Sequence, residues 1–145
     1  MSLWKQPTDL TRLNSWSANT MMEALGIRIT AIGDDWLQGT MPVDARTHQP
    51  YGLLHGGASV ALAETLGSTA AMLTLDPDKE LAVGLDINAN HIRGVRSGTV
   101  TGTARMLHIG RTTSVWQTTV QNSEGRTIAI VTQTQMALPG RSEND

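Results

Sequence analysis

The sequence predicts a single α+β domain in which a mostly antiparallel sheet of about six strands curls around one long helix. Residues 56–75 are rich in Ala, Leu, Met and Val, contain no Pro and are apolar on nearly every face, which is typical of a helix buried on most sides. Much of the chain after this helix alternates apolar and polar residues with a period of two, as strands do. Because a sheet needs one face covered and only one long helix is available, we expect the sheet to wrap around that helix.

The chain begins with short helical segments. Apolar residues at helical spacing predict one or two short helices over residues 8–25. Thr8, Asn14 and Asn19 are the candidate caps, because their side chains accept hydrogen bonds from the free backbone N–H groups at the start of a helix. Gly26 is expected to end this part of the chain.

Two strands are expected before the long helix and four after it, separated by turns rich in Gly, Asp, Asn and Ser. They cover residues 27–32, 36–43, 81–89, 100–106, 115–120 and 127–138. Residues 44–54 contain Pro50 and Gly52 and predict a loop before the long helix. The polar residues after about 139 predict a disordered tail on one domain that spans residues 1–145.

The composition excludes several classes of function. A formal net charge of -2 gives no general attraction to nucleic acid or to an anionic membrane. The absence of Cys excludes disulfides and thiolate metal sites. No segment reaches the roughly 18 consecutive apolar residues of a membrane span. We therefore expect a soluble, cytoplasmic protein that needs no metal or redox cofactor and has neither nucleic acid nor a membrane as its partner.

Glu64 is the strongest candidate for a catalytic residue. It is the only Asp, Glu, Lys or Arg between Arg46 and Asp76, and it lies in the middle of the predicted buried helix. An unpaired ionised carboxylate in an apolar site is costly, so catalysis is the commonest reason to keep one. An exposed stripe on the helix or a distant Arg partner would explain Glu64 without catalysis. Ser68 follows one turn later on the same face, where it either bonds the carboxylate or merely packs.

The start of the long helix is the second candidate site. Gly56 and Gly57 leave backbone N–H groups accessible at the positive end of the helix dipole, which suits an anion or a developing oxyanion. His55 and Gln49 are placed to hold a substrate carbonyl or a water beside those groups. The alternative without chemistry is a flexible helix start that His55 caps.

The helix start and Glu64 lie too far apart to flank one carbonyl carbon. His55 and Glu64 are nine residues apart in the sequence, which is about 13 Å along a helix axis. If both act on one substrate, a second copy of the chain has to supply one of them. We therefore expect a two-fold dimer with two shared sites, each combining Glu64 of one copy with His55 and Gly56 of the other.

A third group combines cationic side chains with a glycine turn. It consists of His91, Arg93, Arg96, His108, Gly110, Arg111 and Thr112. Arg side chains and Gly backbone N–H groups suit contacts with phosphate. A solvated rim of charges at strand ends is the alternative.

The stretch from Gln49 to Ser68 resembles the hotdog thioesterases of the phenylacetic-acid-degradation and 4-hydroxybenzoyl-CoA type. Within that family it is most similar to the 1,4-dihydroxy-2-naphthoyl-CoA thioesterases of menaquinone synthesis and to the enterobactin proofreading thioesterases. The resemblance extends from about Trp4 to Leu138. It implies an antiparallel sheet wrapped around a long helix, and a homodimer or a tetramer of two dimers.

The resemblance also implies a reaction and a role for each residue. Glu64 is expected to be the nucleophile or the general base in the hydrolysis of an aroyl- or acyl-CoA thioester. The N–H of Gly56 of the partner subunit is expected to polarise the thioester carbonyl. Gln49 and His55 would position that carbonyl or the water, and Ser68 would support the late steps.

The resemblance further implies the substrate. His91, Arg93 and residues 110–112 match positions near the nucleotide and pantetheine of coenzyme A, which is part of the substrate, so that no separate cofactor is implied. Glu64 stands where some relatives have Asp, and Gln49 where some have Asn, which favours an aroyl-CoA substrate such as 1,4-dihydroxy-2-naphthoyl-CoA or a similar hydroxyaryl-CoA. Proofreading of aryl or acyl carrier-protein thioesters, with an acyl carrier protein as partner, is the alternative.

Two other classes of function remain open on the residues alone. A hotdog dehydratase that acts on 3-hydroxyacyl thioesters would also use a His and a carboxylate. A non-catalytic acyl-CoA-binding module would leave the isolated Glu64 unexplained.

Overall fold

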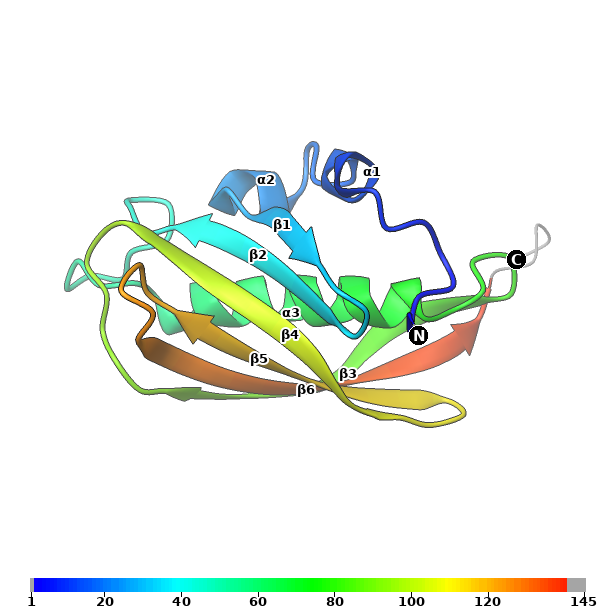
Figure 1. The fold of residues 1–145 in the computed structure, drawn as a ribbon. Coiled ribbons are helices and arrows are strands. Elements are labelled where there is room, and N and C mark those ends of the chain that lie inside the picture. The colour runs from blue at the N-terminus through cyan, green and yellow to red at the C-terminus, as the bar shows by residue number, and fades with distance from the viewer. Residues whose placement is uncertain (1, 141–145) are drawn as a thin grey trace.

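A six-stranded antiparallel sheet wraps around one long helix, as the sequence predicts (Figure 1). The computed structural model describes residues 2–140, so the predicted tail after about residue 139 lies almost entirely outside the described residues. The elements are α1 (Leu10–Ser15), α2 (Met21–Leu25), β1 (Arg28–Ile32), β2 (Trp36–Pro42), α3 (Gly56–Leu73), β3 (Glu80–His91), β4 (Thr99–Ile109), β5 (Thr113–Gln121) and β6 (Thr127–Pro139).

The strands follow the order β1-β2-β4-β5-β6-β3, and every neighbouring pair is antiparallel. The sheet curls so that α3 lies on its concave side, with α1 and α2 beyond β1 (Figure 1). The edge strand β3 is 12 residues long, and within residues 2–140 it pairs with β6 alone. Its outer row of backbone N–H and C=O groups therefore has no strand partner within the described chain.

Small and apolar residues place α3 at the centre of the core. Nine of its 18 residues are buried, and the side chains of Leu62 and Leu66 are fully enclosed. The helix ends at Leu73, two residues earlier than predicted. The side chain of Gln6 donates hydrogen bonds to two backbone carbonyls at this end, which satisfies groups that the last turn of a helix leaves free.

The two N-terminal helices form as predicted, but their caps differ from the prediction. Asp9 caps α1 and Thr20 caps α2, each by accepting a hydrogen bond from the N–H two residues later. The predicted caps were Thr8, Asn14 and Asn19, and all three are wrong. Asn14 instead bonds both the N–H and the C=O of Ile29 in β1, at 2.9 and 2.8 Å. Gly26 ends α2 in the left-handed conformation, with φ 71°, as expected of a glycine there.

A β-bulge interrupts the period-two pattern of β3. The register against β6 shifts between Gly84 and Asp86, so that Leu85 becomes the extra residue and is 57% exposed. A strict period of two would place Leu81, Val83, Leu85, Ile87 and Ala89 on one face of this strand. In the structure Ala82 packs on the core before the bulge and Ile87 packs on it after the bulge. Gly84 therefore shares the inner face with Ala82, next to α3.

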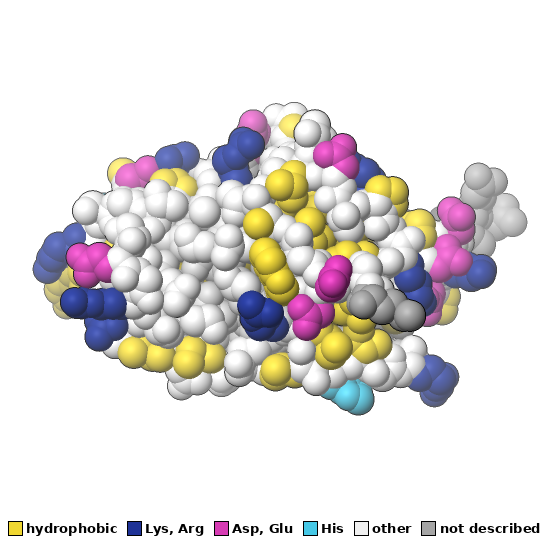
Figure 2. Space-filling view, in the orientation of Figure 1, with side chains coloured by type: hydrophobic (Ala, Val, Ile, Leu, Met, Phe, Trp, Pro, Cys, Tyr) yellow, Lys and Arg dark blue, Asp and Glu magenta, His cyan; other side chains and the backbone are white. Residues whose placement is uncertain are grey.

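Charges of both signs are interspersed on the face shown in Figure 2, with uncharged side chains between them over β4 and β5. The outward side chains of these strands include Thr103, Gln117 and Thr119. Among the described residues of this face, neither sign of charge forms a continuous surface. Among residues 2–140, no helix is long and apolar enough to cross a membrane.

Candidate active site

Glu64 lies near the middle of α3, half-buried, on the wall of a cavity of about 630 Å³. The cavity is framed by α2, α3 and the bulged part of β3. Its apolar wall includes Met21, Met22, Ile27, Val60, Leu85 and Ile87. A carboxylate at the side of an apolar cavity of this kind is the usual arrangement of a small-molecule site, in which a few polar groups act on a mostly hydrophobic ligand.

Hydrogen bonds hold the Glu64 carboxylate. Ser68 Oγ donates to Glu64 Oε1 at 3.2 Å, so the contact predicted from their spacing is present. Gln135 Nε2, from β6, donates to the same oxygen at 3.5 Å and to Ser68 Oγ at 3.1 Å. Glu64 takes part in none of the ion pairs among the described residues. A distant Arg partner in this part of the chain therefore does not explain why a carboxylate lies in the buried helix.

Two residues that the sequence reasoning missed contact this carboxylate. Gln135 is 1% exposed, and Gly84 is its register partner on β3. A Cβ atom on Gly84 would lie 2.6 Å from Glu64 Oε1. For Gln135 a signal was available, because Gln133 and Gln135 occupy alternating positions of β6 that an apolar core would fill. The sequence held no comparable signal for Gly84, because the position of the β-bulge determines which face of the sheet this glycine occupies.

The ring of His55 caps α3. Its Nδ1 accepts a hydrogen bond from the backbone N–H of Gly57 at 2.7 Å, so the capping role considered for this residue is real. The neighbouring Gly56 N–H makes no hydrogen bond within residues 2–140 and lies at the positive end of the α3 dipole. This N–H is therefore free to donate to an acceptor from outside the described chain, and its role toward a substrate oxygen stays a prediction.

Backbone hydrogen bonds fix the loop that precedes α3. The N–H of His55 donates to the carbonyl of Thr47, and the N–H of Gln49 donates to the carbonyl of Leu53, both at 2.8 Å. The side-chain oxygen of Gln49 accepts a hydrogen bond from the N–H of Tyr51. Because that oxygen is engaged, the amide nitrogen of Gln49 is the group left to donate to a carbonyl or a water.

Glu64 and Gly56 line different hollows. Gln49, Gly56, His91 and Arg93 line a second hollow of about 300 Å³, whereas Glu64 belongs to the first. His91, at the end of β3, lies so close to the helix start that a Cβ on Gly56 would fall 2.8 Å from its Nε2. A single chain therefore does not bring Glu64 and Gly56 into one pocket, in agreement with the separation expected from the sequence.

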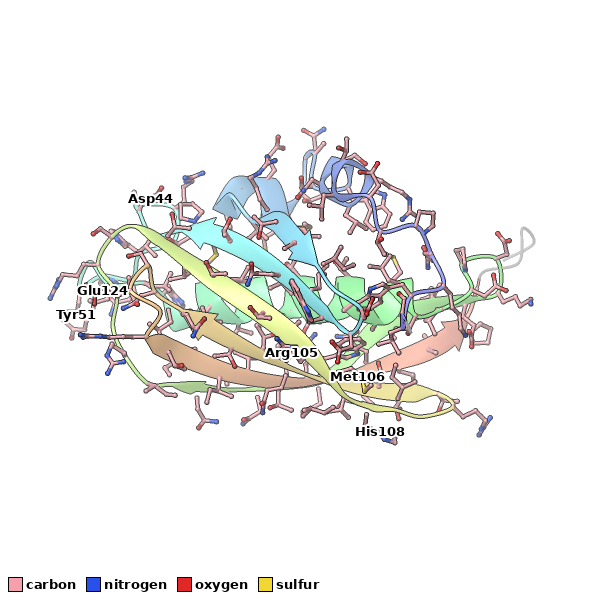
Figure 3. The ribbon with its side chains drawn as sticks, in the orientation of Figure 1. Asp44, Tyr51, Arg105, Met106, His108 and Glu124 are labelled. Atoms are coloured by element: carbon pink, nitrogen blue, oxygen red, sulfur yellow. The ribbon has the colours of Figure 1, made fainter. Side chains whose placement is uncertain are left out.

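The predicted cationic group divides into two. His91 and Arg93 lie beside the start of α3, whereas residues 110–112 line a narrow cavity beside its last turn. Figure 3 shows His108 on the β4–β5 hairpin, well away from Tyr51 in the loop before α3. The expectation of one local concentration is therefore wrong within a single chain, because β4 runs 11 residues along the helix before it reaches the turn.

The described residues thus provide a half-buried carboxylate, a free N–H at a helix start and two cationic groups. They include no cluster of three or more His, Cys, Asp or Glu that is arranged to hold a metal ion. A carboxylate beside an apolar pocket can attack a carbonyl carbon or activate water, and a helix N–H can stabilise the oxyanion that forms. The arrangement fits the transfer of an acyl group to water.

Comparisons with known proteins identify the family. The model of the thioesterase superfamily matches residues 51–129. The proofreading thioesterase EntH of Cronobacter sakazakii is 52% identical over 124 residues, which cover 86% of this chain and 90% of that protein. In the crystal structure of a mutant thioesterase from Pseudomonas aeruginosa, the fold matches with a TM-score of 0.94 at 50% identity, over 96% of this chain and 100% of that chain. A thioesterase of Haemophilus influenzae matches with a TM-score of 0.94 at 45% identity, over 99% of both chains.

These likenesses agree with the family that the Gln49–Ser68 stretch indicates. They argue against the other two classes of function that the residues alone left open, the dehydratase and the non-catalytic binding module. The chain belongs to the thioesterase superfamily, and it is a thioesterase with the hotdog fold.

Proposed function

We propose that this thioesterase hydrolyses an aroyl- or acyl-CoA in the cytoplasm, and that its substrate is 1,4-dihydroxy-2-naphthoyl-CoA, as in menaquinone synthesis, or a similar hydroxyaryl-CoA. The observation that carries the proposal is the half-buried Glu64 carboxylate on the wall of an apolar cavity of about 630 Å³. This volume lies within the range of roughly 300–1,000 Å³ that is usual for small-molecule sites. Coenzyme A belongs to the substrate, so the reaction needs no separate cofactor and no metal.

In the proposed reaction, Glu64 acts at the carbonyl carbon of the thioester. It either attacks this carbon, displaces the thiolate of coenzyme A and forms an anhydride that water then hydrolyses, or it takes a proton from the water that attacks the carbon. The N–H of Gly56 of the partner subunit donates to the carbonyl oxygen as negative charge develops there, an interaction worth roughly 2.7–4 kcal/mol in other enzymes. Gln49 and His55 hold the carbonyl or the water, and Ser68 holds the carboxylate.

The shared site requires a homodimer, and the edge strand β3 supports one. A long unpaired edge is a template for pairing with another strand, and β3 exposes Leu85 beside the cavity that contains Glu64. Two-fold pairing of β3 with its copy would place the start of one α3 near the middle of the other. The proposed assembly is this dimer, with two dimers forming a tetramer.

The same pairing reunites the two cationic groups. When the start of one α3 lies near the middle of an antiparallel copy, the end of that copy points past this start, so His91 and Arg93 of one subunit would lie on the same side of the dimer as residues 108–112 of the partner. Together they would bind the phosphates of coenzyme A through guanidinium and backbone N–H donors. His108, Gly110, Arg111 and Thr112 therefore stay in the proposed binding site, contributed by the second subunit.

Thiol release from a panel of aroyl- and fatty acyl-CoA esters tests the reaction. We expect release from the aroyl esters, and we expect Glu64→Gln to lower kcat by at least about a hundredfold, as for loss of a catalytic base. Glu124→Gln, an exposed carboxylate in the β5–β6 turn, is the matched control and should keep the wild-type rate. An unimpaired Glu64→Gln enzyme would remove Glu64 from the mechanism, and a folded wild type that releases no thiol would contradict the substrate class.

Subunit complementation tests the shared site. Glu64→Gln and the double variant Gln49→Ala/His55→Ala are each expected to be inactive. When equal amounts are unfolded and refolded together, half of the dimers are mixed, and each mixed dimer contains one intact site, so about a quarter of the wild-type activity should return. If Glu64 acted with Gln49 and His55 of its own chain, no activity would return.

A proofreading role toward carrier-protein thioesters is the second candidate, and the 52% identity to the proofreading thioesterase EntH favours it. The two candidates differ in what carries the acyl group. The discriminating measurement is kcat/KM for one hydroxyaryl group presented on coenzyme A and on an aryl carrier protein. A higher value on the carrier protein would establish the proofreading role in place of the CoA substrate.

A further inference from the structure

The Glu64 carboxylate is held through only one of its two oxygens. Oε1 accepts hydrogen bonds from Ser68 Oγ at 3.2 Å and from Gln135 Nε2 at 3.5 Å. Gln135 Nε2 also donates to Ser68 Oγ at 3.1 Å. Oε2 has no hydrogen-bond partner within residues 2–140. These contacts distinguish two oxygens that are equivalent in a free carboxylate.

Gln135 sets the direction of the Ser68 hydroxyl. An amide N–H can only donate and an ionised carboxylate can only accept, so the hydroxyl between them accepts from Gln135 and donates to Glu64. A hydroxyl on a helix can instead donate to the carbonyl four residues earlier. Thr65 of the same helix does so, at 2.7 Å from the carbonyl of Ala61. Gln135 therefore keeps the Ser68 proton directed at the carboxylate.

Gln135 occupies a position where an apolar residue would be more stable. Its side chain is 1% exposed, and its Oε1 has no hydrogen-bond partner in the described part of the chain. A buried amide with an unpaired oxygen is less favourable than an apolar side chain of the same shape. Its register partner Gly84 has no side chain, which leaves the space into which the Glu64 carboxylate extends. A residue that makes the fold less stable and also contacts the active site is typical of a position that is kept for function.

We infer that Gln135 is a positioning residue of this thioesterase, which holds Glu64 Oε1 directly and through Ser68 and so presents Oε2 to the thioester. The inference rests on the proposed role of Glu64. Asp86 on β3 is the other ionisable side chain in the cavity, and no described cation pairs with Glu64. The amide of Gln135 and the hydroxyl of Ser68 are therefore the donors that hold the carboxylate and fix its rotamer.

Gln135→Met and Gln133→Met form a matched pair of variants. Gln133 is also 1% exposed and also has an unpaired Oε1, but its amide reaches the backbone carbonyl of Glu64 rather than the carboxylate. Both variants are compared with the wild type in urea unfolding and in hydrolysis of the same aroyl-CoA. We expect Gln135→Met to be no less stable than the wild type, yet to have a kcat about tenfold lower with KM changed less than about twofold. Gln133→Met should keep kcat within about twofold.

The split between kcat and KM separates positioning from packing. Loss of the Gln135 donor displaces the reacting carboxylate but leaves the apolar wall of the cavity in place, so kcat should fall while KM changes little. A packing defect in β6 would affect the two Met variants alike.

A folded Gln135→Met enzyme with the wild-type kcat would overturn the inference. Equal losses in the two Met variants would overturn it as well, because they would show a packing effect of β6. If the proposed function itself were wrong, the result would differ, because Glu64→Gln would then retain the wild-type rate.

Discussion

Gly84→Ala should inactivate the enzyme without unfolding it. The backbone of Gly84 does not have a positive φ, so an alanine can adopt its conformation. The new Cβ would lie 2.6 Å from Glu64 Oε1, whereas ordinary contact begins at 3.4 Å. The carboxylate must therefore move by roughly 0.8 Å, and a displacement of about 1 Å can cost about a hundredfold in rate. We expect kcat to fall by about 30- to 100-fold, while the free energy of unfolding stays the same or rises by up to about 1 kcal/mol.

The assay for Gly84→Ala is thiol release, measured beside urea unfolding of the same preparation. Asn88→Ala, an exposed substitution on the same strand, is the control for general damage to β3. In a Glu64→Gln background, Gly84→Ala should cause no further loss, because both changes act on one carboxylate. A Gly84→Ala enzyme with the wild-type kcat would refute the reasoning, and so would an additive loss in the double variant.

Two further predictions concern stability. Thr20→Ala removes the hydrogen bond to the N–H of Met22 that caps α2, so the free energy of unfolding should fall by about 1 kcal/mol in urea titration, while Thr20→Ser should retain it. The Arg46 side chain, by hydrogen bonding, lowers the pKa of Asp44 from 3.8 to about 2. This pair therefore contributes stability above pH 4 that is lost as the pH falls through about 2. Thermal melts from pH 6 to pH 2 should show a small Tm difference between the wild type and Arg46→Ala that disappears at the acid end; a constant difference would contradict the assignment.

Local patterns predicted the main elements and the central carboxylate. The apolar run around Glu64 and the spacing of Ser68 are properties of one helix, so the 3.6-residue period was sufficient to place them on one face. The strands were found because their period of two is equally local. The caps were predicted wrongly because several polar residues near each short helix can accept the same hydrogen bond. Packing decides between them, as when Asn14 bonds the backbone of Ile29 instead of a helix start.

The sequence by itself determined which segments are helix and strand, and that an isolated Glu64 lies in an apolar helix. Only the tertiary structure decided that Gly84 and Gln135 meet at this carboxylate, that a bulge exposes Leu85, and that the cationic residues lie at opposite ends of α3. The physical reason is the range of the interactions. Helical and strand periodicity depends on residues close in sequence, whereas the register of β3 against β6 depends on pairing between segments far apart in the chain.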